Sequence, residues 1–234
     1  MAEALIEVRG LVNRFGAQVV HDHLDMTVER GEVFGIVGGS GSGKSVLLRS
    51  ILGLQRPRAG EVRMLGRDLT QLSTPELKEI KATYGVTFQQ GALFSSLTVL
   101  QNVQLPMLEH LHLSPRALDE LALLKVRLVG LTDEAARKFP AQLSGGMVKR
   151  AALARALALD PQLLMDLRQQ LGLTVIMITH DLDTIFRTCN RVGVIIDRKM
   201  TSDTLEAITR NPHPWIQAYF HGERAQRFGQ GKEH

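Results

Sequence analysis

Glycine and serine alternate in the run GGSGSGKS at residues 38–45, and a lysine and a serine end it. The run fits the pattern G-x-x-x-x-G-K-[ST]. It comes directly after an apolar strand-like segment and directly before a segment whose apolar residues recur at helical spacing. In that setting the glycines allow backbone N–H groups to wrap phosphate oxygens, and the helix N-terminus adds partial positive charge. The run therefore predicts a binding site for a nucleoside triphosphate.

Two side chains of this run have a defined task in phosphate binding. Lys44 is expected to reach the outer phosphates, and the Ser45 hydroxyl is expected to join the coordination shell of Mg²⁺. The alternative is a glycine-rich turn that carries a surface lysine, for which the flanking strand and helix would be coincidental. The predicted phosphate-binding residues are Gly38, Gly39, Ser40, Gly41, Ser42, Gly43, Lys44 and Ser45.

A second segment suited to anions is LSGGM at residues 143–147, which precedes the helical run KRAALARALAL. Ser144, Gly145 and Gly146 would open that helix and present its N-terminus to a phosphate group. A plain helix cap with a Gly-Gly turn is an equally open interpretation. Because one chain needs only one phosphate loop, a second anion site suggests a nucleotide shared between two copies of the chain.

The composition is that of a soluble globular protein. The 234 residues are 44% hydrophobic and 22% charged, which suits one large domain or two lobes. Cys189 is the single cysteine, which excludes a disulfide framework. No run of about 18 apolar residues is present, so no membrane span is expected. The net charge of +4 is mild and no basic stripe with aromatics exists, so nucleic acid is not expected as a partner.

Strand and helix patterns alternate at both ends of the chain, with helical patterns between them. The expected fold class is therefore α/β, with a parallel core sheet and an inserted helical subdomain. We expect residues 1–90 and 151–220 to form the nucleotide-binding core, residues 91–150 the helical subdomain, and residues 221–234 a flexible tail. Strand patterns occupy residues 5–12, 24–28, 33–37, 60–66, 85–88, 162–165, 174–179 and 192–196, the last of them.

The order of the motifs GGSGSGKS, FQQG, LSGG and ITHD resembles that of the ATP-binding cassette (ABC) ATPases, and it covers nearly the whole chain. The resemblance implies a P-loop NTPase cassette that uses ATP and Mg²⁺. It also implies that two copies close head to tail, so that each ATP lies between one phosphate loop and the partner's LSGG segment. A permease in the membrane would be the third component.

Three further site residues follow from this resemblance. Phe15 resembles the aromatic residue that stacks on adenine, although a phenylalanine in the core or at a strand edge is the alternative. Gln89 resembles the glutamine that senses Mg²⁺ and the attacking water and links to the membrane subunit; Gln90 matches less well. His180 resembles the histidine that contacts the γ-phosphate, whereas a histidine that ends a buried strand is more often structural.

Finer features resemble the ATPase subunit of MCE-type, Mla-like bacterial lipid transporters. These features are Met147 in place of the family's usual glutamine, the segment FQQGALFSSLTVLQNV and the tail HPWIQAYFHG. The resemblance implies an MCE-type lipid-binding protein as a partner, phospholipid or another hydrophobic cargo, and a place on the cytoplasmic face of the bacterial inner membrane. Residues 91–107 are expected to dock the permease, with a core-packed helix and loop as the alternative.

The carboxylates that this family needs are not found. The family places an aspartate and then a glutamate after the strand represented here by residues 162–165. The aspartate holds Mg²⁺ and the glutamate activates the attacking water. Asp166 follows the strand one residue too early and precedes Leu167, and no glutamate occurs between Glu134 and Glu206.

The spacing of the strands indicates a gap at the same place. Parallel neighbouring strands need a connection of about a dozen residues or more, and residues 166–173 are only eight. Roughly twenty residues are missing against the family pattern, which is enough for the carboxylates, a loop and most of a helix. Three explanations are open. The segment is present in the molecule although this sequence omits it, or it is truly deleted. In the third, Asp166 takes over as the Mg²⁺ aspartate in a rearranged site.

Two other functions remain open. One is a soluble ABC ATPase acting on nucleic acid or ribosomes, but such proteins usually carry two cassettes or a long insertion. The other is a nucleotide-binding protein deficient in hydrolysis, which a true deletion would favour. We hypothesise that the chain as written is not a competent ATPase.

Overall fold

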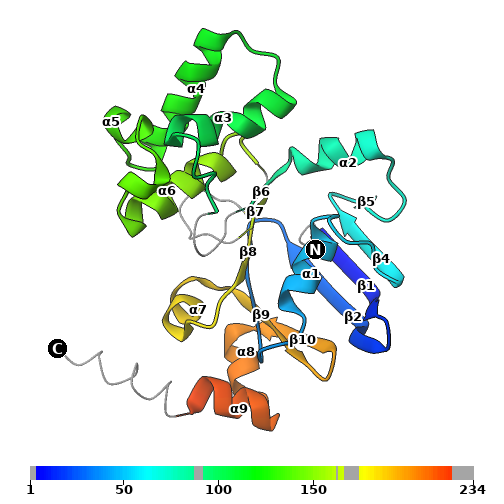
Figure 1. The fold of residues 1–234 in the computed structure, drawn as a ribbon. Coiled ribbons are helices and arrows are strands. Elements are labelled where there is room, and N and C mark those ends of the chain that lie inside the picture. Colours follow the sequence, from blue (N-terminus) through cyan, green and yellow to red (C-terminus); the bar gives the residue numbers. More distant parts are fainter. Residues whose placement is uncertain (1–3, 87–91, 162, 166–173, 223–234) are drawn as a thin grey trace, which may run out of the picture. The chain divides into compact units, whose positions relative to one another are not determined.

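A computed structural model describes residues 4–86, 92–161, 163–165 and 174–222 (Figure 1). The chain forms two compact units, one of residues 1–77 with 168–234 and the other of residues 78–167. Strands and helices alternate along the sequence and parallel strand pairs are present, so the expected α/β class is confirmed. None of the helices in the described ranges is long and apolar enough to cross a membrane.

An antiparallel sheet begins the first unit, with strand order β2-β1-β4-β5. The connection between β1 and β2 has only two residues, Gly16 and Ala17, so these strands must form a hairpin. Gly16 adopts a φ of 57°, which suits glycine in a tight turn. The strands are β1 (Ala4–Phe15), β2 (Gln18–Glu29), β4 (Ala59–Met64) and β5 (Arg67–Asp68).

The second sheet of this unit contains parallel strands. Strand β3 pairs in parallel with β8 on one side and β9 on the other, and β10 pairs antiparallel with β9. A strand flanked in this way is buried on both faces, which explains the continuous apolar run at residues 33–37. The strands are β3 (Val33–Gly38), β8 (Thr174–Ile178), β9 (Arg191–Ile196) and β10 (Lys199–Thr204).

The prediction that residues 192–196 form the last strand is wrong. Strand β10 and helices α8 and α9 follow β9. The sequence of β10, KMTSDT, is polar and mostly exposed, so it lacks the apolar pattern on which strand recognition depends. The helices of this unit are α1 (Lys44–Ile51), α7 (Leu182–Thr188), α8 (Leu205–Arg210) and α9 (Pro214–His221).

Helix α2 (Thr74–Lys81) runs from the first unit into the second, which is mainly helical. Side chains of Thr98, Ser114, Thr132 and Ser144 cap its helices by accepting a backbone N–H bond, as expected for hydroxyl residues at helix starts. The elements are β6 (Tyr84–Val86), α3 (Val99–His110), α4 (Pro115–Leu128), α5 (Asp133–Ala136), η1 (Pro140–Gln142), α6 (Gly145–Ala156) and β7 (Leu163–Met165).

This helical unit is wider than the subdomain expected at residues 91–150, because it also holds the parallel pair β6–β7. The boundaries expected between the nucleotide-binding core and the helical subdomain therefore stay a prediction. Most of the expected tail lies outside the described residues. Within the proposed permease-docking segment, Val103 and Met107 are buried in the core of the unit, whereas Phe94 is 57% exposed. The core-packed alternative thus holds for one face of α3, and docking stays a prediction.

Candidate nucleotide-binding site

The phosphate loop begins at the carboxyl end of β3 and ends at the first turn of α1. The ammonium group of Lys44 folds back and donates hydrogen bonds to the carbonyl oxygens of Gly38 and Gly39, each at 2.8 Å. A third, longer bond of 3.4 Å reaches the Ser42 hydroxyl. Burial removes part of the water around the Lys44 ammonium group and lowers its pKa. An anion beside Lys44 would therefore stabilise its charge.

Two glycines of the loop occupy positions where any other side chain would approach a neighbouring atom too closely. Gly43 has a φ of 94°, and a Cβ there would lie 2.5 Å from Nε2 of His21 and 2.6 Å from Cγ1 of Val20. Gly38 has a φ of 158°, and a Cβ there would lie 2.6 Å from the Ser42 hydroxyl. The loop is therefore pressed closely against β2 and folded on itself.

The groups that a phosphate would contact are open. Gly43 is the N-cap of α1 and supplies no side-chain hydrogen bond, so the first N–H groups of the helix are not capped by a side chain. Ser40, Gly41 and Ser45 are exposed. An anion at a helix N-terminus is stabilised by these N–H groups and by the helix dipole. The loop as it stands fits a phosphate chain.

The fit to Mg²⁺ rests on a single hydroxyl in the part of the chain that the structure describes. Ser45 is exposed beside the loop, and no group of three or more His, Cys, Asp or Glu side chains capable of holding a metal occurs among the described residues. Mg²⁺ commonly binds through phosphate oxygens and waters with one or two protein ligands. The loop suits a metal that arrives with a nucleotide.

An open pocket of about 400 Å³ lies between the β1–β2 hairpin, the phosphate loop and the turn from β9 to β10. Phe15 ends β1 in the same hairpin and is 49% exposed, so it is not a core residue. Its contact with adenine stays a prediction. The pocket is lined by Ala17, Gln18, Val19, Val20, Gly41, Ser42, Ile195, Asp197 and Arg198.

His180 lies at the same edge of the sheet as the phosphate loop. Strand β8 runs parallel to β3 with Ile178 beside Ile36, and His180 follows two residues later, as Gly38 does on β3. The carboxyl ends of parallel strands are where α/β proteins place their ligands. His180 is exposed, so it is not a buried structural histidine, and its contact with a γ-phosphate stays a prediction.

The other predicted site residues are not brought together by this structure. Gln89 and Asp166 lie outside the described residues. Ser144 begins α6 in the helical unit, and its hydroxyl accepts a bond of 3.3 Å from the N–H of Met147. Gly145 and Gly146 are exposed, with nothing within 4 Å of the position of an added Cβ. This helix start is open, and its contact with a partner's nucleotide stays a prediction.

Sequence reasoning missed the residues that lie beneath the loop. Asn13 and His21 are paired neighbours on β1 and β2, and both are buried. The Asn13 amide donates to Nδ1 of His21 at 3.0 Å, so Nε2 carries the hydrogen and faces Gly43. Burial lowers the pKa of His21 to about 4. Two polar residues at inward positions of paired strands were the signal that could have revealed them.

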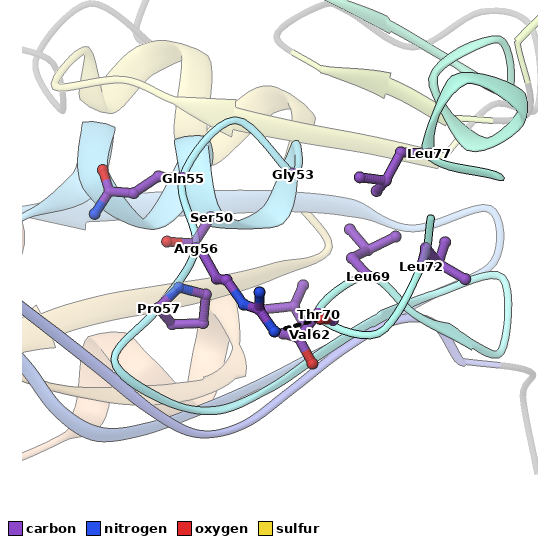
Figure 2. A pocket seen from close by; sticks show the side chains of 10 residues that line it. All are labelled: Ser50, Gly53, Gln55, Arg56, Pro57, Val62, Leu69, Thr70, Leu72 and Leu77. Atoms are coloured by element: carbon purple, nitrogen blue, oxygen red, sulfur yellow. Dashed lines mark hydrogen bonds between the residues drawn. The ribbon is translucent and has the colours of Figure 1, made fainter. Parts of the chain in front are cut away.

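The polar network continues from Asn13 to the far end of α1. Its amide also donates to the Ser50 hydroxyl at 3.1 Å, and its oxygen accepts from Gln55 at 3.3 Å. Ser50 and Gln55 line a small pocket of about 130 Å³, where Arg56 donates to the carbonyl of Thr70 (Figure 2). The support of the phosphate loop therefore reaches from β1 through α1 to this pocket.

A glycine-built loop with an inward lysine at a helix start, at the carboxyl edge of a parallel sheet, defines a P-loop nucleotide-binding protein. The family described as ABC transporter matches residues 21–166 of the chain. The chain belongs to this family as an ATP-binding subunit. The family consists of ATPases.

Relatives with several cargoes match the chain. The intermembrane phospholipid transport system ATP-binding protein MlaF of Haemophilus influenzae is 35% identical, over 95% of this chain and 92% of MlaF. The probable ribonucleotide transport ATP-binding protein mkl of Mycobacterium tuberculosis is 33% identical, over 97% of this chain and 69% of mkl. The methionine import ATP-binding protein MetN of Lacticaseibacillus paracasei is 42% identical, over 75% of this chain and 55% of MetN.

Solved structures agree with the assignment. The ATP-binding cassette MJ0796, solved as a dimer bound to ADP and Pi, has a TM-score of 0.74 and 28% identity, over 86% of this chain and 98% of that one. The CbiO1 protein of Clostridium perfringens has a TM-score of 0.78 over 97% of this chain and 99% of its own, and at 21% identity it supports the fold alone.

The alignment with mkl contains positions at which this chain has no residue. The alignment runs over 250 residues, more than the 234 of the chain. It covers 97% of the chain, about 227 residues, so about 23 aligned positions have no residue here. The family match ends at residue 166, directly after the strand where the sequence predicts the gap. The number of these positions is close to the roughly twenty residues of the predicted gap, whose place in the chain stays a prediction.

The contact of Gly43 with His21 predicts a steric effect that can be measured against a matched control. Gly43→Ala places a methyl group against the His21 ring, whereas Gly41→Ala, at a φ of 76°, meets nothing within 4 Å. Both variants strain the backbone, but only the first displaces the loop. We expect Gly43→Ala to weaken ATP binding at least about 10-fold more than Gly41→Ala, measured by equilibrium titration. Equal losses would show that His21 does not shape the loop.

The lowered pKa of His21 predicts a pH-dependent stability. The folded state binds a proton only near pH 4, while the unfolded chain binds one near 6.5. Stability is therefore complete above about pH 6.5 and is lost as the pH falls toward 4. Between pH 7.5 and pH 5, urea unfolding should show wild-type protein losing about 2 kcal/mol more than His21→Gln. The same loss in both proteins would rule out His21 as the titrating group.

Proposed function

We propose that the chain binds Mg²⁺-ATP in its phosphate loop and uses it to drive lipid transport through a separate membrane permease. The observation that carries this proposal is the glycine-built loop, whose helix start has no side-chain cap and whose Lys44, among the described residues, is bonded to the loop's own oxygens. These contacts are made within the loop itself, so phosphate oxygens could replace them at the same ammonium group. Gln89 and His180 would complete the site on the side of the γ-phosphate.

The residues of the chain would act on the nucleotide in distinct ways. Lys44 would transfer its hydrogen bonds from Gly38 and Gly39 to phosphate, which places a positive charge where negative charge develops. The N–H groups at the start of α1 would orient the phosphate chain, and Ser45 would hold the metal. Bound Mg²⁺-ATP supplies the phosphoryl group whose transfer to water releases the energy.

We further propose that two copies act together, head to tail. The exposed start of α6, at Ser144, Gly145 and Gly146, is a second anion-ready site in the same chain. Its exposure supports a contact with the nucleotide of a partner copy. The similarity to a cassette solved as a dimer gives the same support.

A lipid cargo is supported by the extent of the similarity to MlaF. That alignment covers nearly all of both chains, whereas the MetN alignment covers 55% of MetN. The proposed partners are therefore a membrane permease and an MCE-type lipid-binding protein. The proposed location is the cytoplasmic face of the bacterial inner membrane, to which the chain would bind through the permease.

Purification of the tagged chain from its host membranes in mild detergent tests this proposal. A permease and an MCE-type protein should co-purify, together with phospholipid and without RNA or DNA. Phe94→Asp, at an exposed position of the proposed docking segment, should reduce recovery of the permease several-fold while ATP binding is unchanged. A methionine- or nucleotide-specific permease, or bound nucleic acid, would reject the lipid assignment.

A second candidate function is nucleotide binding without hydrolysis. The observation that favours it is the absence of glutamate between Glu134 and Glu206, together with the aligned positions that this chain lacks. The glutamate that activates water in this family therefore has no counterpart in that stretch. The phosphate loop would still hold ATP, because its residues lie elsewhere in the chain.

Turnover measured beside binding separates the two candidates. Protein whose intact mass agrees with 25.9 kDa should bind ATP but release phosphate no faster than Lys44→Ala. A steady rate of phosphate release that Lys44→Ala abolishes would reject the hydrolysis-deficient candidate. A heavier chain that hydrolyses ATP would show that the missing segment exists in the molecule.

A further inference from the structure

Helix α9 brings the indole of Trp215 to the phosphate loop. Nε1 of Trp215 lies 3.9 Å from the position that a Cβ on Gly39 would take. The carbonyl of Gly39 is one of the two that hold the ammonium group of Lys44. A residue nearly 180 positions from the loop in sequence is thus beside one of the loop's two lysine-binding carbonyls.

The buried face of α9 is packed on the elements that lead into the site. Ile216 and Phe220 are almost fully buried in a cluster with Val37, the residue before Gly38. The same cluster contains Leu182 and Ile185 of α7, the helix that follows His180. One face of α9 therefore contacts the strand before the phosphate loop and the helix after His180.

Aromatic rings form a continuous series along this face. Trp215 and Tyr219 are stacked, with centroids 4.9 Å apart and planes at 11°. Tyr219 meets Phe220 edge to face at 5.0 Å, and Phe220 meets Phe186 of α7 edge to face at 6.0 Å. Rings in such contact attract one another beyond what their buried area gives. The series joins the phosphate loop to α7.

The hydroxyl of Tyr219 lies close enough to the turn after His180 to sense the charge of Asp181. Its oxygen is buried and has no hydrogen-bond partner among the described residues. Burial and the nearby carboxylate of Asp181 raise the pKa of Tyr219 to about 12. Asp181 follows His180 directly and caps α7 by accepting from the N–H of Asp183. A shift of this turn would change the surroundings of the Tyr219 hydroxyl.

We propose that α9 links the phosphate loop to the turn at His180 through its aromatic rings, with Trp215 as a positioning residue for Gly39. The inference rests on the proposed binding of nucleotide at the loop. Nucleotide that draws Lys44 away from the carbonyl of Gly39 releases that peptide, and Trp215 limits how far it moves. The cost of that movement is shared with α7 through Tyr219, Phe220 and Phe186.

Intrinsic fluorescence tests the contact, because Trp215 is the single tryptophan of the chain. Titration of the full chain with Mg²⁺-ADP should change its emission in a saturable way, with the same midpoint as binding of a fluorescent ADP analogue. Lys44→Ala should abolish the change. An emission that stays constant while the analogue binds would overturn the inference and leave the proposed function intact. Wild-type protein that binds no analogue would overturn both.

Substitution of Trp215 tests its role in positioning. Trp215→Phe keeps an aromatic ring on Tyr219 but withdraws the indole from Gly39, and we expect nucleotide affinity to fall about 5-fold to 10-fold. Ile216→Val is the matched control, since it removes one buried methyl group from the same helix without touching the loop. The control should lower stability but keep the affinity. An unchanged affinity in Trp215→Phe, or an equal fall in the control, would overturn the inference.

A double-mutant cycle tests the link to α7. His180→Ala and Trp215→Phe should not be additive in nucleotide affinity, with a coupling of about 3-fold or more. The coupling should disappear when Phe186→Leu breaks the ring series. Additive effects, or a coupling that survives Phe186→Leu, would overturn the link.

Discussion

The two hydrogen bonds from Lys44 to the carbonyls of Gly38 and Gly39 are the interaction on which the rest of the site depends. They fold the loop around its own lysine and leave the first N–H groups of α1 uncapped by side chains. Among the described residues Lys44 is held by carbonyl and hydroxyl oxygens, which carry no full charge, and this is costly for a partly desolvated ammonium group. A phosphate chain supplies the missing charge and finds the loop already in shape.

Side chains from other elements hold the loop in its shape. His21 lies under Gly43, and it is oriented by Asn13, which in turn is held by Ser50. Trp215 lies beside Gly39 from the C-terminal helix. The phosphate loop is thus a segment of backbone without bulky side chains, enclosed by bulky side chains from distant parts of the sequence. Such support holds a binding loop in its productive geometry before the ligand arrives.

Local patterns predicted the strand, the loop and the helix of the phosphate site correctly, because each has a short-range cause. Strand β3 is apolar throughout since it is buried on both faces, and glycines are required where φ is positive. Long-range pairing could not be predicted in this way. The contacts of His21 with Gly43 and of Trp215 with Gly39 depend on register and topology, and strand β10 has no apolar pattern. Gln89 and residues 166–173 lie outside the described residues. The sequence made its main predictions about catalysis at these positions.

A calorimetric titration with Mg²⁺-ATP of wild-type chain and of Lys44→Met tests the central claim most directly. Methionine keeps most of the length of the lysine side chain and removes only its charge and its donors. The account predicts one saturable site per chain in wild type, and an affinity at least about 30-fold lower in the variant, as expected for the loss of charge-assisted hydrogen bonds. A folded wild-type chain that binds no ATP, or a variant that binds it equally well, would contradict the account.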